Sequence, residues 1–399
     1  MSLSIGIVGA GIGGLTTALA CHHAGLENLT VYEQATEPSA AGAGVQLSPN
    51  ATRILRALRL LPAIEEAAFT PQFIHLRSSH SGFLIAQLAL GDFAQARYGA
   101  PYLNIHRGDL HEQLTKALAA RNIEIVYDRR CERIEISDQE VRVHFQSGTP
   151  ASHQVLVGAD GIHSAIRGAL IPNSAPQFTG HVAWRGLVPA TALPDNLFPG
   201  TVTAWMGPDK HFVHYYVRGG EFINFVGVVE DQTWREESWV APADKAKLRH
   251  DFEHWHSNIG ILIEASEDVN RWALYDRKPL ERWSHGRVTL LGDACHPMLP
   301  YLAQGAAQSI EDAWVLARML DQWEEDPAAG LVEYEKYRLP RTRRVQAAAT
   351  AQGDNFHLST PFDVWKRNLT LSLGSRFLPE LAMQRNDWLY TYDAVNGFE

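Results

Sequence analysis

The stretch SIGIVGAGIGGLTTALA, residues 4–20, decides the fold of this 399-residue chain. It begins with an aliphatic run typical of a buried parallel strand, and small and apolar residues then recur at helical spacing. Between the two stand Gly9, Gly11 and Gly14 in the order GxGxxG. The first glycine lets a strand turn tightly, the second lets the backbone approach a ligand, and the third lets helix and strand pack closely. A helix N-terminus aimed into this turn offers free N–H groups to a pyrophosphate.

The next predicted strand, LTVYEQA at residues 29–35, carries an acid where a dinucleotide needs one. Glu33 follows Gly14 by 19 positions. At that spacing a carboxylate accepts hydrogen bonds from the hydroxyls of an adenosine ribose. A glutamate at a strand end is often only solvated, but the order of strand, glycine turn, helix, strand and acid favours ribose binding. Residues 4–35 therefore predict a dinucleotide-binding site, and they do not distinguish between FAD and NAD as its ligand.

Composition excludes several classes of function. The chain is 45% hydrophobic and 20% charged, with a formal net charge of −10, which is typical of a globular protein and argues against a nucleic-acid partner. Its three cysteines show no CxxC or metal-ligand spacing, so we expect no metal site and a reducing, cytoplasmic location. We expect no signal peptide and no membrane partner, because no apolar run is long enough to span a bilayer.

The order of predicted elements indicates an α/β protein whose domains are interleaved. Strands and helices of βαβ type recur in three separate ranges, which we assign to one Rossmann-like dinucleotide-binding domain. These ranges are 1–70, 101–176 and 276–325. The last includes a buried strand in GRVTLLGDACHP and a helix expected from about Gly305 to Gln322.

Residues 71–100 and 177–275 are assigned to a second domain. Short aromatic and β-branched segments, separated by Gly, Pro and Asp, predict an antiparallel sheet there. Gly219 and Gly220 lie between two such segments. They predict a two-residue hairpin turn, because glycine tolerates the positive φ angles that such turns require.

The remaining residues, 326–399, predict a helical C-terminal segment. The stretch LVEYEKYRLPRTRRVQAAATAQ, residues 331–352, predicts an exposed amphipathic helix that carries Pro340. Its arginines alternate with glutamates and tyrosines, and its apolar face is modest. These features favour a packing or subunit-contact helix over a membrane role.

Three separated motifs occur in order along the chain: GAGIGGLTTALA at 9–20, GADGIHSAIR at 158–167 and LGDACHPMLPYLAQGAAQSIEDA at 291–313. Together they resemble the single-component FAD-dependent aromatic hydroxylases, in the branch of salicylate hydroxylase, 3-hydroxybenzoate 6-hydroxylase and 6-hydroxynicotinate 3-monooxygenase. The resemblance covers nearly the whole chain. It implies a Rossmann-like FAD-binding domain, an interleaved antiparallel-sheet substrate domain and a helical C-terminus. Because no second GxGxxG follows a strand, NADH or NADPH is expected as a transient electron donor.

The resemblance also implies contacts to FAD. Asp293 would accept hydrogen bonds from the ribityl chain, and the helix that begins with Gly305 and Ala306 would aim its N–H groups at the flavin N1 and C2 oxygen. A helix N-terminus at that place stabilises the negative charge of the reduced flavin. Asp160 would support the pyrophosphate side, and Arg167 the approach of the nicotinamide donor.

Three further positions match cofactor contacts of the family. Arg107 in HRGDL matches a flavin-contacting arginine, and Gln46 in GAGVQLSPNA matches a cofactor or substrate contact. Cys131 matches a position whose backbone touches the adenine part, so its thiol is expected to be incidental. Some relatives carry a histidine proposed as a base in the loop of Gln46. This chain has none there, so that role is not carried over.

The implied reaction hydroxylates a small phenolic or N-heteroaromatic carboxylate with O2 through a flavin C4a-hydroperoxide. Deprotonating a ring hydroxyl makes the ring more nucleophilic, so a general base within hydrogen-bond reach is useful. In HFVHYYV, side chains alternate along a strand, so His211 and Tyr215 share one face and His214 lies on the other. The resemblance places His211 and Tyr215 toward the ring, with His211 as the base and Tyr215 positioning the hydroxyl or carboxylate.

Other candidates have two interpretations each. His296 either touches the substrate or packs near the flavin edge. Arg185 and Arg218 either bind an anionic substrate or are structural. The aromatic residues expected to line the pocket are Trp184, Trp205, Phe212 and Tyr216.

Two alternative functions stay open. One is hydroxylation of a larger phenolic or quinolone-like secondary metabolite, and the other is a FAD-binding redox module that does not hydroxylate. The expected partners are a small aromatic substrate, O2 and NAD(P)H, and a homodimer is compatible with the resemblance.

Overall fold

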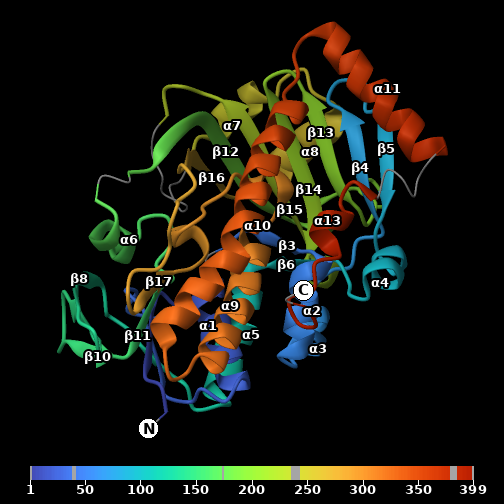
Figure 1. Cartoon of the computed structure of the whole chain (residues 1–399). Helices are drawn as coiled ribbons and strands as arrows, with labels where there is room; N and C mark the ends of the chain where they lie inside the picture. Colours follow the sequence, from blue (N-terminus) through green and yellow to red (C-terminus); the bar gives the residue numbers. More distant parts are fainter. Residues whose placement is uncertain (1, 38–41, 173–174, 235–242, 378–383, 398–399) are drawn as a thin grey trace.

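The computed structural model describes residues 2–37, 42–172, 175–234, 243–377 and 384–397. Its helices are α1 Ile12–His23, α2 Pro49–Ala57, α3 Leu61–Ala67, α4 Asp92–Tyr98, α5 Arg107–Ala119, α6 Ala165–Leu170, α7 Lys245–Asp251, α8 Ser257–Ala265, α9 Gly305–Gln322, α10 Pro327–Phe356, α11 Pro361–Phe377 and α13 Asp387–Tyr390. Its strands are β1 Ile5–Val8, β2 Leu29–Tyr32, β3 Gly44–Leu47, β4 Phe73–Ser78, β5 Leu84–Ala89, β6 Leu103–His106, β7 Glu124–Val126, β8 Cys131–Ile136, β9 Val141–Phe145, β10 Ala151–His153, β11 Val155–Gly158, β12 Gln177–Pro189, β13 Val202–Gly207, β14 Lys210–Val217, β15 Phe222–Glu230, β16 Val269–Asp276 and β17 Val288–Leu290. Figure 1 shows the long helices α9 and α10 running side by side along the molecule.

A parallel sheet in the order β17-β11-β1-β2-β7 forms the dinucleotide-binding part. In open sheets of this kind ligands bind beyond the carboxyl ends of the strands. Four predicted cofactor residues follow those ends: Gly9 after β1, Glu33 after β2, Asp160 after β11 and Asp293 after β17. The α/β fold class is confirmed, and the predicted cofactor residues meet at one edge of the sheet.

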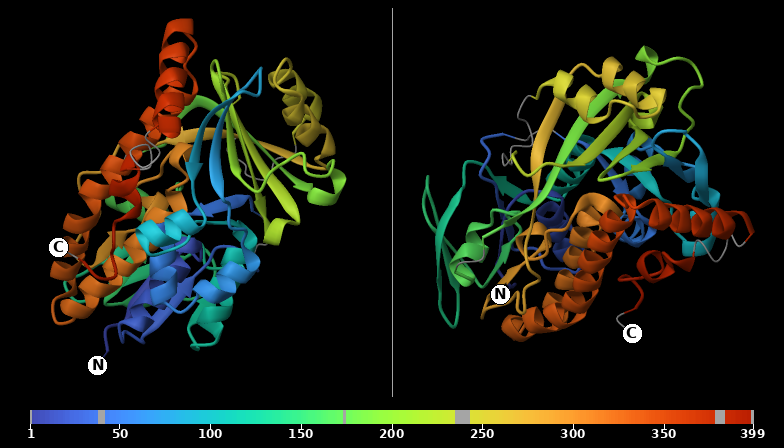
Figure 2. Two further views of the ribbon diagram at one scale, coloured as in Figure 1. Left: turned by 90° about the vertical axis from the view of Figure 1, so that its right-hand side faces the viewer. Right: turned by 90° about the horizontal axis from the view of Figure 1, so that it is seen from above.

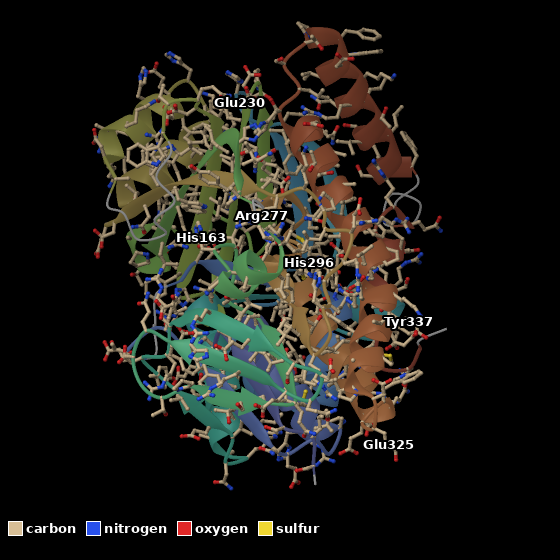
Figure 3. All side chains as sticks on the ribbon, turned by 60° about the vertical axis from the view of Figure 1, so that its left-hand side comes forward. His163, Glu230, Arg277, His296, Glu325 and Tyr337 are labelled. Atoms are coloured by element: carbon tan, nitrogen blue, oxygen red, sulfur yellow. The ribbon has the colours of Figure 1, made fainter. Side chains whose placement is uncertain are left out.

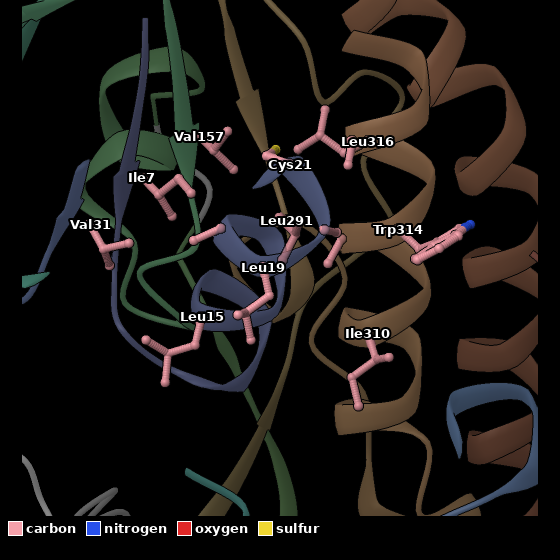
Figure 4. Close-up of a cluster of buried hydrophobic side chains, with 14 of the residues drawn as sticks. Ile7, Leu15, Leu19, Cys21, Val31, Val157, Leu291, Ile310, Trp314 and Leu316 are labelled. Atoms are coloured by element: carbon pink, nitrogen blue, oxygen red, sulfur yellow. The ribbon is translucent and has the colours of Figure 1, made fainter. Parts of the chain in front are cut away.

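Helix α1 packs between this sheet and α9 through a buried aliphatic cluster that includes Leu15, Leu19 and Ile310 (Figure 4). The close approach depends on glycine. A Cβ atom on Gly14 would lie 1.9 Å from the Gly9 carbonyl oxygen, and Gly9 has a φ of +108°. Both glycines therefore perform the packing and turning roles predicted from the motif.

The second sheet is seven-stranded, in the order β16-β12-β15-β14-β13-β4-β5. Helices α7 and α8 cover one of its faces over an aromatic core (Figure 2). Most neighbouring strands are antiparallel, as predicted, but β13 pairs with β4 in parallel. Because β4 and β5 come from an earlier part of the chain, the hairpin they form joins the sheet edge without a local turn to set its direction. The domain limits given above stay a proposal.

The hairpin between β14 and β15 differs from the prediction in length. The strands end at Val217 and begin again at Phe222, so four residues connect them, not two. Gly219 and Gly220 have φ angles of +62° and +103°. The predicted positive φ angles are present, within a longer turn.

Helix α10 contradicts the prediction of an exposed helix. It continues through Pro340, and one face, with Tyr334, Arg338 and Val345, is fully buried. The reason is that the arginines face carboxylates of α9, which the sequence of α10 alone cannot reveal.

Within the described part of the chain, no helix has both the length and the apolar character needed to cross a membrane.

Candidate active site

Two helix N-termini open onto the edge where the predicted cofactor residues meet. The N-cap residues Gly11 of α1 and Gln304 of α9 make no side-chain capping bond. A Cβ atom built on Gly11 or on Gly305 would meet no atom within 4 Å. Free N–H groups beside open space suit the phosphates and the N1 and C2 oxygen of a flavin dinucleotide.

The carboxylate of Glu33 is fixed at the glycine turn. Its Oε2 accepts from the N–H of Ala10 at 2.8 Å, and its Oε1 accepts from the N–H of Ala35 at 2.9 Å. Each oxygen keeps a lone pair, so the ribose role predicted for Glu33 is sterically and chemically open. On the other side of the edge, Arg107 and Asp293 are exposed and lie close enough to interact electrostatically. The residues present therefore fit FAD.

The loop after β11 uses its polar side chains internally. The Asp160 carboxylate accepts from the hydroxyl of Ser164 at 2.5 Å and from the N–H of Ala165 at 2.7 Å, which caps α6. Arg167 is buried and donates to the carbonyl of Ala294 at 3.1 Å. The guanidinium of Arg167 therefore braces the loop of Asp293, and its expected role in the approach of the nicotinamide donor stays a prediction.

Cys131 begins β8 and is buried. Burial raises the pKa of its thiol to about 12, with the nearby Asp160 and Glu132 charges acting in the same direction. The thiol stays protonated at neutral pH. This agrees with the expectation that the thiol itself has no chemical role.

Behind the cofactor edge lies a group that we call the ion network: His296, Glu311, Asp312, Arg338 and Arg341. Arg338 donates to Asp312 at 2.7 Å and to Glu311 at 2.5 Å, and Arg341 donates to Glu311 at 2.6 Å. The Nε2 of His296 lies 2.5 Å from Asp312. Burial alone would raise the pKa values of Glu311 and Asp312, but the neighbouring cations hold both below their usual range. The bond between His296 and Asp312 supports the interpretation that His296 packs near the flavin edge over the one in which it touches the substrate.

The ion network could not be predicted from the sequence. Its acids and arginines are 26 to 30 positions apart, and each pair looks like an ordinary helical surface. The only local signal is that Glu311 and Asp312 interrupt an apolar stretch of α9, between Ile310 and the run Ala313–Ala317.

A cavity of about 970 Å³ lies between the seven-stranded sheet and the C-terminal helices. Its wall is formed largely by apolar side chains of β4, β5, β13, β14, α10 and α11. Three polar side chains in the wall come from near the cofactor edge or the sheet: Gln46, Tyr102 and His211. One cation also lines it, Arg385, which belongs to none of the sequence motifs.

His211 is placed in this wall by β14 and is 3% exposed. Its Nδ1 lies 2.7 Å from the Nε2 of His357 at the end of α10. Burial, and then the neighbouring His357 and His181, hold the pKa of His211 well below its usual value. The ring is therefore neutral at pH 7 and has an atom, Nε2, that can accept a proton.

Tyr215 lies on the same face of β14, as predicted. Burial raises the pKa of its hydroxyl, although the Arg185 charge and a hydrogen bond with Gln46 oppose the shift. Tyr102 also donates to Gln46, at 2.6 Å. Tyr215 therefore remains a hydroxyl donor beside Gln46.

His211 belongs to a larger group that we call the histidine cluster: His181, His211, Glu230, Tyr301 and His357. The Tyr301 hydroxyl lies 3.0 Å from the Nδ1 of His181. Glu230 Oε1 lies 3.8 Å from His181 Nε2 and 3.7 Å from His357 Nδ1. His357 was missed by sequence reasoning, because it lies 146 positions from His211 and no local pattern links the two.

The aromatic residues expected in the pocket lie elsewhere. Trp184, Trp205 and Phe212 pack in the core on the opposite face of the sheet, and Tyr216 packs against that core. Successive side chains of a strand point to opposite faces of the sheet. Because His211 faces the cavity, Phe212 must face the core. Arg218 is also away from the cavity, in an ion pair with Asp109 at 3.0 Å.

A parallel dinucleotide-binding sheet, two uncapped helix N-termini and a cavity with a neutral histidine are the features of a dinucleotide-dependent oxidoreductase. Comparison with family models matches residues 2–349 to the family described as FAD binding domain. The chain belongs to this family, and it is a FAD-dependent aromatic-ring monooxygenase that uses reduced nicotinamide.

The relatives confirm the predicted branch. The chain is 40% identical over 391 residues to 3-amino-4-hydroxybenzoate 2-monooxygenase PtnB3 of Streptomyces platensis, covering 98% of this chain and 96% of the relative. It is 39% identical over 345 residues to 6-hydroxynicotinate 3-monooxygenase of Bordetella bronchiseptica, covering 86% and 89%. A salicylate hydroxylase substrate complex matches with a TM-score of 0.81 and 26% identity, covering 98% of this chain and 96% of that one.

Proposed function

We propose that this enzyme hydroxylates a small aromatic ring bearing both a hydroxyl and a carboxylate, of the hydroxybenzoate or hydroxynicotinate kind, with His211 as the general base. The observation that carries the proposal is the neutral, buried His211 ring in the cavity wall, bonded at Nδ1 to His357. The substrates named for the two relatives support the substrate class.

The cofactor half has a holding role in this proposal. When bound, FAD supplies the electrons and the activated oxygen, after reduction by NADH or NADPH. The turn at Gly11 and the carboxylate of Glu33 hold the pyrophosphate and ribose. Arg107, Asp293 and the N-terminus of α9 at Gly305 hold the flavin end.

The substrate half moves one proton. His211 carries its own proton on Nδ1, which donates to His357 Nε2, and its Nε2 accepts the proton of the substrate hydroxyl. Tyr215 is not among the residues that line the cavity, but its hydroxyl, which its raised pKa keeps protonated, is bonded to Gln46 in the wall and positions the substrate through that side chain. Arg385 in the cavity wall, or Arg185 near Tyr215, offers the charge that a carboxylate requires.

The test is NADH and NADPH oxidation by the FAD-loaded protein with 3-amino-4-hydroxybenzoate, 6-hydroxynicotinate, 3-hydroxybenzoate and salicylate. Hydroxylated product and hydrogen peroxide are measured in the same reactions. We expect one ring to stimulate oxidation strongly with little peroxide. Slow oxidation with every ring, and all electrons recovered as peroxide, would contradict the substrate class.

A second candidate substrate is a larger phenol, such as a quinolone-like metabolite. The cavity volume of about 970 Å³ favours it, because a single ring occupies only part of such a space. Adding a bicyclic hydroxyquinolone to the same panel separates the two. Tight FAD binding without stimulation by any compound would instead indicate a non-hydroxylating redox module.

Expectations about the cellular setting remain part of this proposal. The net charge of −10 supports the absence of a nucleic-acid partner. We place the enzyme in the cytoplasm, without a membrane partner, and treat a homodimer as compatible with the family.

A further inference from the structure

Two histidines of the histidine cluster aim a ring nitrogen at one carboxylate. His181 Nε2 and His357 Nδ1 lie 3.8 and 3.7 Å from the same oxygen, Oε1 of Glu230. All three atoms lie within 4.8 Å of one another. Strands β12 and β15 and the end of α10 supply one residue each. The distances are too long for hydrogen bonds and leave space between the three atoms.

The other nitrogen of each ring is already held. Tyr301 bonds to His181 Nδ1 at 3.0 Å, and His211 Nδ1 lies 2.7 Å from His357 Nε2. Metal-binding histidines have this arrangement, in which a bond to the far nitrogen fixes the ring and leaves the near nitrogen for the ion. Glu230 is 48% exposed, so an ion has a path from solvent.

We propose that His181, Glu230 and His357 form a binding site for Zn²⁺ or a similar divalent transition-metal ion, and that its occupancy inhibits hydroxylation. Zinc takes imidazole nitrogen and carboxylate oxygen at about 2.0–2.2 Å, so ligand atoms in a tetrahedral site are roughly 3.3–3.5 Å apart. The two distances to Glu230 need to close by only a few tenths of an ångström, and the two histidine nitrogens, which lie within 4.8 Å of each other, need to approach to the same spacing. The fourth position stays open to water on the exposed side.

A second group of metal-ligand residue types does not offer such a site. Cys295, His296 and Asp312 also lie within 4.8 Å of one another, and all three are buried. However, Asp312 is already bonded to Arg338 at 2.7 Å and to His296 at 2.5 Å. Cysteine spacing alone predicted no metal site, whereas the proposed ligands are histidines and a glutamate dispersed over the chain.

The inhibition rests on the proposed base, His211. An ion on His357 Nδ1 displaces the proton there, so neutral His357 takes the proton that His211 held on Nδ1. Neutral His211 then carries its proton on Nε2, taken from solvent. The pair gains and loses one proton, so its charge is unchanged. His211 Nε2 no longer has a lone pair to accept the proton of the substrate hydroxyl.

The experiment uses FAD-loaded, tag-free protein treated with a chelator and dialysed. Zn²⁺ binding is measured by calorimetry, and the ratio of product formed to NADH oxidised is measured at each Zn²⁺ concentration, relative to each variant's own value without metal. We expect one Zn²⁺ per chain, and a falling ratio with rising peroxide as the site fills. Glu230→Gln is expected to weaken binding and shift the inhibition at least 10-fold.

A matched control is available on the surface. Glu253 lies between His250 and His254, at 3.4 and 3.7 Å, and all three are exposed without a second bond to hold the rings. Glu253→Gln is expected to leave Zn²⁺ binding and inhibition unchanged. Unchanged affinity in Glu230→Gln would overturn the site.

The base assignment is judged separately. If His211→Asn lowers the product ratio in metal-free buffer but a filled site does not, the proposed inhibition is overturned. If His211→Asn leaves the ratio unchanged, the proposed function fails, while calorimetry still decides whether the metal site exists.

Discussion

The molecule contains two clusters of buried ionisable side chains, and they compensate for the cost of burial in different ways. In the ion network, Glu311 and Asp312 are matched by Arg338 and Arg341, and every charge has a partner of opposite sign. In the histidine cluster, His211 and His357 are neutral rings, and the carboxylate beside His357, that of Glu230, is half exposed. Glu230 lies well above His296, a member of the ion network, in the view of Figure 3.

The difference explains what each group does. Paired buried charges are costly to rearrange, so the ion network holds the loop of Asp293 and the helices α9 and α10 in place. Neutral rings exchange a proton or a tautomer at small cost. The histidine cluster is therefore the part of the molecule suited to chemistry, and the ion network is the part suited to holding the cofactor edge still.

The largest expected effect comes from breaking the ion network. Arg338→Met leaves two buried carboxylates without their shared cation, and we expect the free energy of unfolding to fall by about 3–5 kcal/mol. Urea unfolding of the FAD-loaded protein measures it. The control is Lys336→Met on the same helix, where an exposed pair with Glu333 is lost and the expected change is below about 1 kcal/mol. Equal losses in the two variants would refute the comparison.

Acid distinguishes the ion network from a buried neutral histidine, for which we use His214, a residue outside the histidine cluster. Burial, with Arg77 and His75, lowers the pKa of His214 from 6.5 to about 3. In the unfolded chain the ring titrates near pH 6.5. Below that pH the unfolded state therefore binds one proton that the folded state does not bind. The free energy of unfolding falls by about 1.4 kcal/mol per pH unit until the pKa of the folded state is reached. Glu311 and Asp312 have lowered pKa values, so the ion network loses stability only at lower pH.

The measurement is the unfolding free energy at pH 7, 6 and 5 for the wild type and His214→Leu. The variant is expected to show a shallower dependence on pH, by about one proton's worth of slope. An identical slope in both proteins would mean that His214 does not exclude a proton in the folded state.

A smaller effect is expected when the partner of His211 is changed. His357→Phe keeps an aromatic ring but removes the bond that fixes the His211 tautomer, and we expect kcat to fall about 10-fold. His357→Gln retains an oxygen that accepts from His211 Nδ1 and is expected to recover most of the rate. The product formation rate across pH 6–9, at saturating substrate, is the readout. Equal rates in the two variants would show that the hydrogen bond is irrelevant.

The sequence predicted the cofactor half well because its signals are local. The glycine turn, the acid of Glu33 and the helix from Gly305 to Gln322 are each specified within a few residues, and the structure places them as expected. The alternation of β14 likewise predicted that His211 and Tyr215 share a face.

The rest depends on contacts between distant segments. Alternation tells which residues share a face, but not which face meets the cavity, so Phe212 and Trp205 were placed in the pocket when they belong to the core. The partners of Arg338 and His211 come from other elements far along the chain. No local pattern encodes such pairing, and only the folded arrangement reveals it.

The central claim is that His211 removes the proton of the substrate hydroxyl. The most direct test is product formed per NADH oxidised by FAD-loaded wild type and His211→Asn, in metal-free buffer with the best aromatic substrate. We predict that product formation falls about 10²–10⁴-fold, while NADH oxidation continues and its electrons appear as hydrogen peroxide. A variant that forms product at the wild-type rate, with unchanged coupling, would contradict the account.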